Sequence, residues 1–187
     1  SSMMLAMMGS SGLEQFHALP ENDALYKNQY DVKAGHWPEN EHQCVVVLTK
    51  DGRLYDMTLY SLGLKSGEEL DKILDAVADD KTVETSDKLE TFDYDDFLGI
   101  KLKLVNASDY YVYDNEFSVW KDKSDNDKYI ENLVKDGEDL EVVGVVQPKD
   151  GEDITMLTAG VSYPVSLVNH VIEEASKSKI VKAQIKN

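Results

Sequence analysis

The sequence predicts an α+β fold, in which a mixed or antiparallel sheet is flanked by helices. The prediction depends on three short strand regions, residues 30–34, 44–48 and 142–147, which are bounded by turn residues. Runs of this length that are rich in valine are typical of strands, and the last one indicates a strand buried on both faces. Strands and helices then follow one another without the regular alternation of a parallel α/β sheet, which favours the α+β class.

Charge is the extreme property of the composition. The 187 residues include 19 basic and 36 acidic side chains, a formal net charge of −17. A surface of this sign repels nucleic acid unless it carries a local basic patch. The best candidate patch, residues 177–186, is diluted by apolar residues and is typical of a solvated face at a helix C-terminus. The single cysteine, Cys44, excludes an internal disulfide and, because it precedes a valine run, is expected to be a small buried apolar residue.

The N-terminal residues 1–25 are predicted to be a Met/Ser-rich segment followed by a helix, close to a membrane, ahead of an α+β domain over 26–187. Four methionines recur at helical spacing and predict an apolar stripe for contact with a partner: Met3, Met4, Met7 and Met8. Two alternatives are a packed first turn and a segment foreign to the native chain. No apolar run reaches the ~20 residues that cross a bilayer. The start on Ser1 suggests a piece cut from a longer protein, with membrane segments outside it.

The first strand, 30–34, leads into a turn at 35–38, where a glycine permits positive φ and a proline stiffens the chain. Strand 44–48 ends in a reversal marked by the Asp51-Gly52 pair. Residues 59–64 are predicted to form a short helix that closes at its glycine. These elements form the first half of the expected sheet.

A capping box at 66–69 predicts an amphipathic helix, and the acidic stretch 79–96 is expected to be mostly loop. Alternation over 100–104 predicts a half-exposed strand. Two aromatic runs, 110–113 and 117–120, predict a hairpin.

Beyond the hairpin, Ser124 is expected to cap a helix that ends before Gly137. Gly144 lies inside the valine run 142–147, where the missing side chain permits close packing or a bulge. A second strand over 160–163 and a helix starting at Pro164 follow, with a last helix from about residue 178.

No residue pattern predicts catalysis. His36 and His42 with Glu39 and Glu41 form a weak candidate metal site, because no helical spacing fixes them, and an exposed turn is favoured. An acidic turn at 93–96 and a calcium-loop-like stretch at 125–127 are better explained as solvated turn and helix start. His170 is expected to be a surface or boundary residue of a helix rather than a catalytic base. Phosphate-loop, serine-elbow and zinc-protease motifs are absent from the sequence.

The best candidate for a ligand-binding surface is the aromatic hairpin. Aromatic side chains on a hairpin stack against sugars or peptides. Alternation along the strands turns about half of them toward the core, and core packing is the default interpretation. The residues that remain candidates for ligand contact are Tyr110, Tyr111, Tyr113 and Trp120, with Phe117 beside them.

Taken together, the order of several short motifs resembles one family. These motifs are Tyr30-Asp31-Val32-x-Ala34-Gly35-x-Trp37-Pro38, Cys44-Val45-x-Val47-Leu48, Leu59-Tyr60-x-Leu62-Gly63-Leu64, Val142-Val143-Gly144-Val145-Val146-x-Pro148 and Tyr163-Pro164. Over residues 26–185 the chain is similar to the extracytoplasmic, periplasmic-core-like domain of MacB/FtsX-type ABC transporter permeases of Gram-positive bacteria. The family usually has arginine where His36 stands.

The resemblance implies a non-catalytic domain on the extracellular face of the membrane, without a cofactor or metal. It would relay movement driven by a separate cytoplasmic ABC ATPase, reached through transmembrane helices outside this chain, and an extracellular protein or peptide is a further partner. A secreted ligand-binding module that uses the tyrosine-rich hairpin is the main alternative, and a hydrolase using Cys44 or His36 is the third. The expected structural motif residues are Gly35, Trp37, Pro38, Gly144, Pro148, Tyr163 and Pro164.

Overall fold

A mixed sheet forms the centre of the protein. The computed structural model describes residues 3–6, 16–64 and 92–186. In this part of the chain seven strands form one sheet in the order β1-β5-β8-β4-β9-β2, and β3 also pairs with β8. The predicted α+β class with a mixed sheet is therefore confirmed. The strands of this sheet are β1 (Met3–Ala6), β2 (Phe16–Ala18), β3 (Tyr30–Gly35), β4 (Gln43–Val47), β5 (Lys101–Val105), β8 (Glu138–Pro148) and β9 (Gly160–Tyr163).

Strand β8 is the central strand of this sheet and pairs with three others. One edge of β8 pairs in parallel with β4, while the other pairs with antiparallel β5 near its start and with antiparallel β3 near its end. Consecutive side chains point to opposite faces, and Val145 and Val146 lie in two different core clusters, both 0% exposed. This confirms the prediction of a strand buried on both faces.

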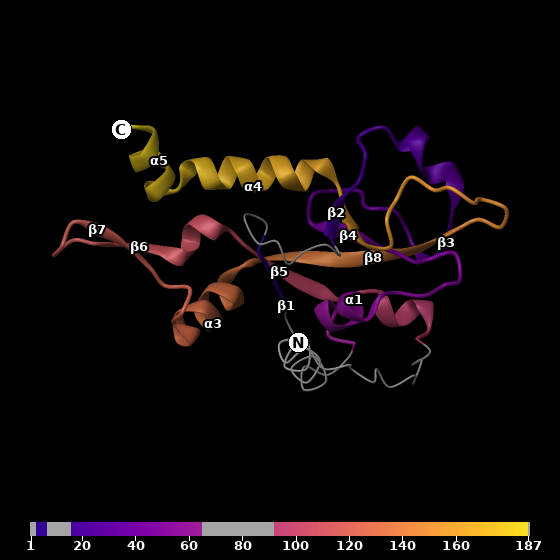
Figure 1. The fold of residues 1–187 in the computed structure, drawn as a ribbon, viewed down its shortest axis with the longest axis horizontal. Coiled ribbons are helices and arrows are strands. Elements are labelled where there is room, and N and C mark those ends of the chain that lie inside the picture. Colours follow the sequence, from indigo (N-terminus) through magenta and orange to yellow (C-terminus); the bar gives the residue numbers. More distant parts are fainter. Residues whose placement is uncertain (1–2, 7–15, 65–91, 187) are drawn as a thin grey trace, which may run out of the picture.

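Strand β4 divides its side chains in the same way. Cys44 and Val46 lie in the larger core cluster, which also takes residues from α1, η3 and α4. Val45 and Val47 lie in the smaller cluster, together with Tyr26 and Tyr30. Figure 1 shows α1 and the short helix after the grey segment on one side of the sheet, with the 19–30 segment on the other.

The helices begin and end largely where the local signals place them. Gly63, with φ of 73°, follows α1, and Pro164 precedes α4 as predicted. The predicted cap at Ser124 is wrong, because the Asn126 side chain accepts the hydrogen bond from Tyr129 N at 3.0 Å. The helices are α1 (Asp56–Ser61), α3 (Asp127–Asp136), α4 (Val165–Lys177) and α5 (Lys179–Ile185), with 3-10 turns η1 (Asp23–Leu25), η2 (Lys27–Gln29), η3 (Tyr94–Phe97) and η4 (Ala107–Tyr110).

The helix predicted within residues 1–25 is wrong for residues 3–6 and 16–18, which are strands, whereas residues 23–25 form the 3-10 turn η1. Met3 and Met4 lie in β1, which pairs in parallel with β5, and residues 16–18 form β2, which pairs in parallel with β9. Pairing with an open sheet edge overrides the local helical spacing. Met7 and Met8 lie outside the described residues, as does the amphipathic helix predicted after residue 66.

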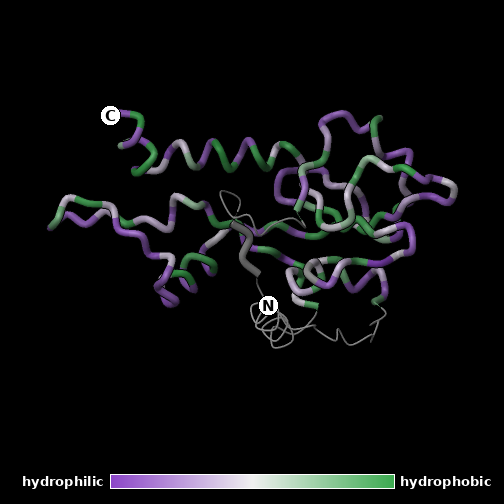
Figure 2. Tube along the Cα trace, viewed as in Figure 1, coloured by the Kyte–Doolittle hydropathy of each residue, from purple (hydrophilic) through white to green (hydrophobic). Residues whose placement is uncertain are grey.

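A second, two-stranded sheet lies apart from the first. It is the predicted hairpin, formed by β6 (Tyr111–Asp114) and β7 (Val119–Asp122), and it extends beyond the sheet beside α3 and α5 (Figure 1). Hydrophobic residues follow the central strands and appear again in this extension (Figure 2). Among the described residues, no helix combines the length and the apolar character needed to cross a membrane.

Candidate functional site

The predicted motif residues form a packing site around the β3–β8 pair. Gly35 and Gly144 stand directly opposite each other in the strand register, and Gly35 has a φ of 63°. A Cβ on Gly35 would lie 1.9 Å from the carbonyl oxygen of Val143, and one on Gly144 would lie 2.1 Å from that of His36. Both glycines are therefore required by close backbone approach, as predicted for Gly144.

Trp37 follows this contact and closes the smaller core cluster. Its ring meets the rings of Tyr26 and Tyr30 edge to face, at centroid distances of 5.3 and 6.2 Å. Pro38 and Pro164 line a hollow beside Trp37, Tyr163 packs against the larger core, and Pro148 pairs with Tyr30 at the end of β8. This part of the molecule consists of packed backbone and aromatic rings, and it serves as scaffold.

The aromatic hairpin is not packed into either core cluster, so the expectation of core packing is wrong for it. Tyr111 and Tyr113 are 39% and 41% exposed. Together with Trp120 they line a groove of about 760 Å³, which we call the aromatic groove; its other wall comprises Leu133 of α3 and Ile180 and Ala183 of α5. The tertiary structure thus forms an exposed groove from residues that alternation alone divides between core and solvent.

Local contacts hold the aromatic groove in shape. The rings of Tyr113 and Trp120, which are cross-strand neighbours, meet edge to face at 5.2 Å. The hydroxyl of Tyr129 donates to the carbonyl oxygen of Asp109 at 2.6 Å, and burial raises the pKa of Tyr129. Tyr110 is half-buried at the base of the hairpin, where its carbonyl oxygen accepts from Lys123 N at 2.8 Å; burial also raises the pKa of Tyr110.

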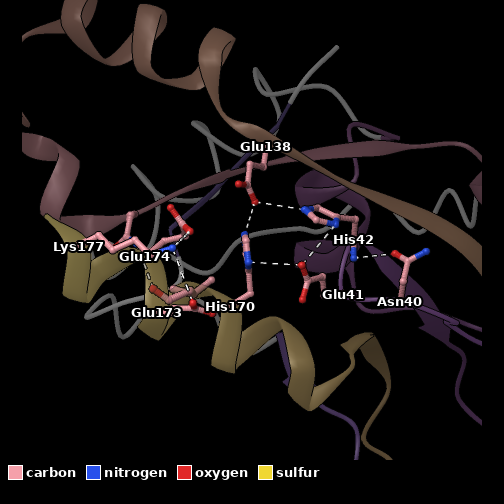
Figure 3. A network of polar contacts seen from close by, with 10 residues as sticks. Asn40, Glu41, His42, Glu138, His170, Glu173, Glu174 and Lys177 are labelled. Carbon is pink, nitrogen blue, oxygen red and sulfur yellow. Dashed lines mark hydrogen bonds and ion pairs between the residues drawn. The ribbon is translucent and has the colours of Figure 1, made fainter.

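A second cluster of functional groups lies where α4 crosses the start of β8. We call it the histidine–glutamate cluster, and it comprises Glu41, His42, Glu138 and His170 (Figure 3). Oε2 of Glu138 lies 2.7 Å from Nε2 of His170 and 3.3 Å from Nε2 of His42. Oε1 of Glu41 lies 3.4 Å from Nδ1 of His170 and 4.0 Å from Nδ1 of His42.

Electrostatics within this cluster favour charge on both partners. The hydrogen bond to Glu138 raises the pKa of His170, against a smaller opposing effect of burial. Burial raises the pKa of Glu138, but the hydrogen bonds from His170 and His42 outweigh it, so that the pKa of Glu138 lies below its usual value. One atom each of Glu41, His42 and His170 lie within 4.8 Å of one another, as metal ligands do.

The sequence pointed to only part of this cluster. His42 and Glu41 were grouped with His36, but Nδ1 of His36 contacts the carbonyl oxygen of Trp37 at 2.7 Å instead. His170 comes from α4, and no residue spacing along the chain predicts that it lies beside His42. His170 was expected to be a surface or boundary residue of a helix, and the structure confirms the boundary position, since 19% of its side chain is exposed.

The remaining candidates have structural explanations. Asp93 and Asp96 form a capping box at the start of η3. Cys44 is 0% exposed, and burial raises the pKa of its thiol, which removes it as a nucleophile in the folded state. The stretch 125–127 starts α3, as expected.

Comparison of the chain with models of protein families, with curated proteins and with solved structures gave no match in any of the three.

Proposed function

We propose that the chain is a non-catalytic extracytoplasmic domain of a MacB/FtsX-type ABC permease, which relays movement driven by a cytoplasmic ATPase. The observation that carries the proposal is the convergence of the motifs behind this resemblance. Gly35 and Trp37, at and just after the end of β3, lie more than 100 residues before Gly144 and Pro148 of β8, and the β3–β8 pairing brings these two groups together. A motif set that serves backbone packing rather than a reactive centre supports a mechanical role.

The arrangement of β8 also supports a relay. Its first residues pair with β5 beside α3, and its last residues pair with β3 in the core. Between them, Val142, Val145 and Val146 are 0% exposed, and close-packed protein cores transmit displacement with little compression. A movement applied at the α3 end therefore reaches the β3 end through one continuous strand.

The location is tested on the full-length gene product in its own cells, with Ile154→Cys as a reporter. Ile154 is 87% exposed, whereas the natural Cys44 is 0% exposed and serves as the unlabelled background. We expect a membrane-impermeant maleimide to label the variant in intact cells, the wild type to stay unlabelled, and the product to fractionate with membranes. Labelling only after lysis, or recovery in the soluble fraction, contradicts the proposal.

The relay is tested by affinity purification of the same product from detergent-solubilised membranes. We expect an ABC ATPase to copurify, or an ATPase domain to be present in the same polypeptide. Recovery of the membrane protein without either refutes the mechanical role while leaving the location intact.

A second candidate function is peptide binding in the aromatic groove. The exposed Tyr111 and Tyr113 face an apolar wall that includes Ile180, and this combination suits a peptide with apolar side chains better than a sugar, which needs many polar partners. We expect Tyr111→Ala and Trp120→Ala to abolish binding on a peptide array. Phe117→Ala is the matched control, because Phe117 is 64% exposed on the same hairpin but does not line the groove. No binding to any peptide, or binding to glycans only, refutes this candidate.

A further inference from the structure

We infer that Glu41, His42 and His170 form a binding site for a divalent transition-metal ion, most suitably zinc, and that Glu138 positions both imidazole rings. The inference concerns the isolated chain and does not depend on the proposed function. It rests on the geometry of the histidine–glutamate cluster (Figure 3).

The ring nitrogens divide the cluster into two sides. Both Nε2 atoms face the same oxygen of Glu138, at 2.7 and 3.3 Å, and donate N–H hydrogen bonds to it. A metal ion binds the neutral imidazole, in competition with the second proton, and in that form each ring keeps its proton on Nε2, so that both Nδ1 atoms present lone pairs. Both of these face Oε1 of Glu41, at 3.4 Å from His170 and 4.0 Å from His42.

This arrangement matches a carboxylate–histidine–metal site. Metal-bound histidines usually donate their second N–H to a carboxylate, which fixes the tautomer and the ring orientation. Zinc bonds of about 2.0–2.1 Å in tetrahedral geometry place neighbouring ligand atoms about 3.3 Å apart. The Glu41–His170 pair, at 3.4 Å, already has about this separation, whereas the 4.0 Å between Glu41 and His42 must shorten to complete the set.

The ligand set of two imidazole nitrogens and one carboxylate is typical of zinc, with a fourth position left for water. Calcium and magnesium are disfavoured, because they prefer oxygen ligands. The net charge of −17 further favours the approach of a cation.

Packing holds the three ligands in place before an ion binds. The backbone carbonyl oxygen of His42 accepts from Glu141 N at 2.8 Å, which ties this loop to β8. The Asn40 side chain accepts from His42 N at 2.9 Å. On α4, His170 lies between the buried residues Leu167 and Val171. An ion bound here would link α4 to the loop before β4.

The test is titration of the purified, chelator-treated chain with Zn²⁺ by calorimetry, and with Co²⁺ by visible absorption, whose intensity reports four-coordinate geometry. We expect one equivalent to bind to the wild type with a four-coordinate Co²⁺ spectrum. His42→Ala, His170→Ala and Glu41→Gln are expected to lose more than ~100-fold in affinity, and Glu138→Ala to lose ~10–100-fold as a positioning residue.

His36→Ala is the matched control, since His36 is a neighbouring histidine outside the cluster, and it is expected to bind as the wild type does. Circular dichroism checks the fold of each variant, and His42→Ala is the safest of them because 44% of this side chain is exposed. The site is refuted if the wild type binds no stoichiometric metal, or if His42→Ala binds it unchanged. A larger loss from Glu138→Ala than from Glu41→Gln overturns the assignment of Glu41 as the ligand.

Discussion

Replacing Gly35 by alanine is expected to lower the free energy of unfolding by about 2–5 kcal/mol. The φ of 63° at Gly35 costs a residue with a Cβ about 1–2 kcal/mol. The new Cβ would also lie 1.9 Å from the carbonyl oxygen of Val143 and 3.0 Å from Cδ2 of Leu98. The carbonyl must move, and overpacking of this kind costs a further ~1–3 kcal/mol. The shift also endangers the hydrogen bond from His36 N to the same carbonyl, 3.0 Å long.

Gly99→Ala separates the two contributions. Gly99 has a φ of 79°, but a Cβ there would meet nothing within 4 Å, so only the backbone cost of about 1–2 kcal/mol is expected. Urea unfolding followed by circular dichroism measures both variants against the wild type. Gly144→Ala tests the same close approach from the opposite strand, because its Cβ would lie 2.1 Å from the His36 carbonyl oxygen. It is expected to lower the free energy of unfolding by at least ~1–3 kcal/mol. Equal losses for Gly35→Ala and Gly99→Ala would refute the close-approach argument.

Three further predictions follow from the described contacts. Asn126→Ala should cost about 1 kcal/mol through loss of the α3 cap, whereas Ser124→Ala should stay within ~0.5 kcal/mol; urea unfolding that ranks them the other way contradicts the observed cap. In chelator-treated protein, His170 has a raised folded pKa, so its contribution to the free energy of unfolding is complete below the unfolded pKa of 6.5 and is lost as pH rises through the folded pKa. The contribution of Glu138 to the free energy of unfolding, since its folded pKa is lowered, is present above its ordinary pKa of 4.5 and is lost as pH falls through the folded pKa. The difference in the free energy of unfolding between wild type and His170→Ala should therefore be largest between pH 4.5 and 6.5. A difference that does not change with pH refutes this prediction. Cys44, 0% exposed, should react with a thiol reagent only on unfolding, so that its labelling follows the urea transition; rapid labelling in buffer would show that the core opens.

Much of the sheet could be predicted because its signals are local. Strands β4 and β8 follow from valine-rich runs, β3 follows from a short strand-like stretch before a glycine turn, and the turn after α1 follows from a glycine. Gly144 was correctly expected to permit close packing, although only the structure identifies His36 as the neighbour. Backbone preference and side-chain alternation act over a few residues, and a single sequence contains them in full.

The failures have a common cause. The spacing of Met3 and Met4 is compatible with a helix, but both residues pair with β5 as a strand. Strand β5 lies 97 or more residues further along the chain. The tyrosines of the hairpin were expected to share in core packing, but their hairpin extends past the sheet and faces α3 and α5 instead. In both cases the decisive partner comes from a remote part of the sequence.

The sequence by itself determined the α+β class, the valine-rich central strands and the glycines where β3 and β8 pair closely. These features depend on backbone preference and residue size, which act between neighbours in the chain. Only the tertiary structure decided which functional groups meet. His42 and His170 are 128 residues apart, and they share Glu138 solely because α4 packs across the start of β8. That packing is a cooperative result of the whole core, since the burial of Leu167 and Val171 sets the position of His170, and no local pattern encodes it.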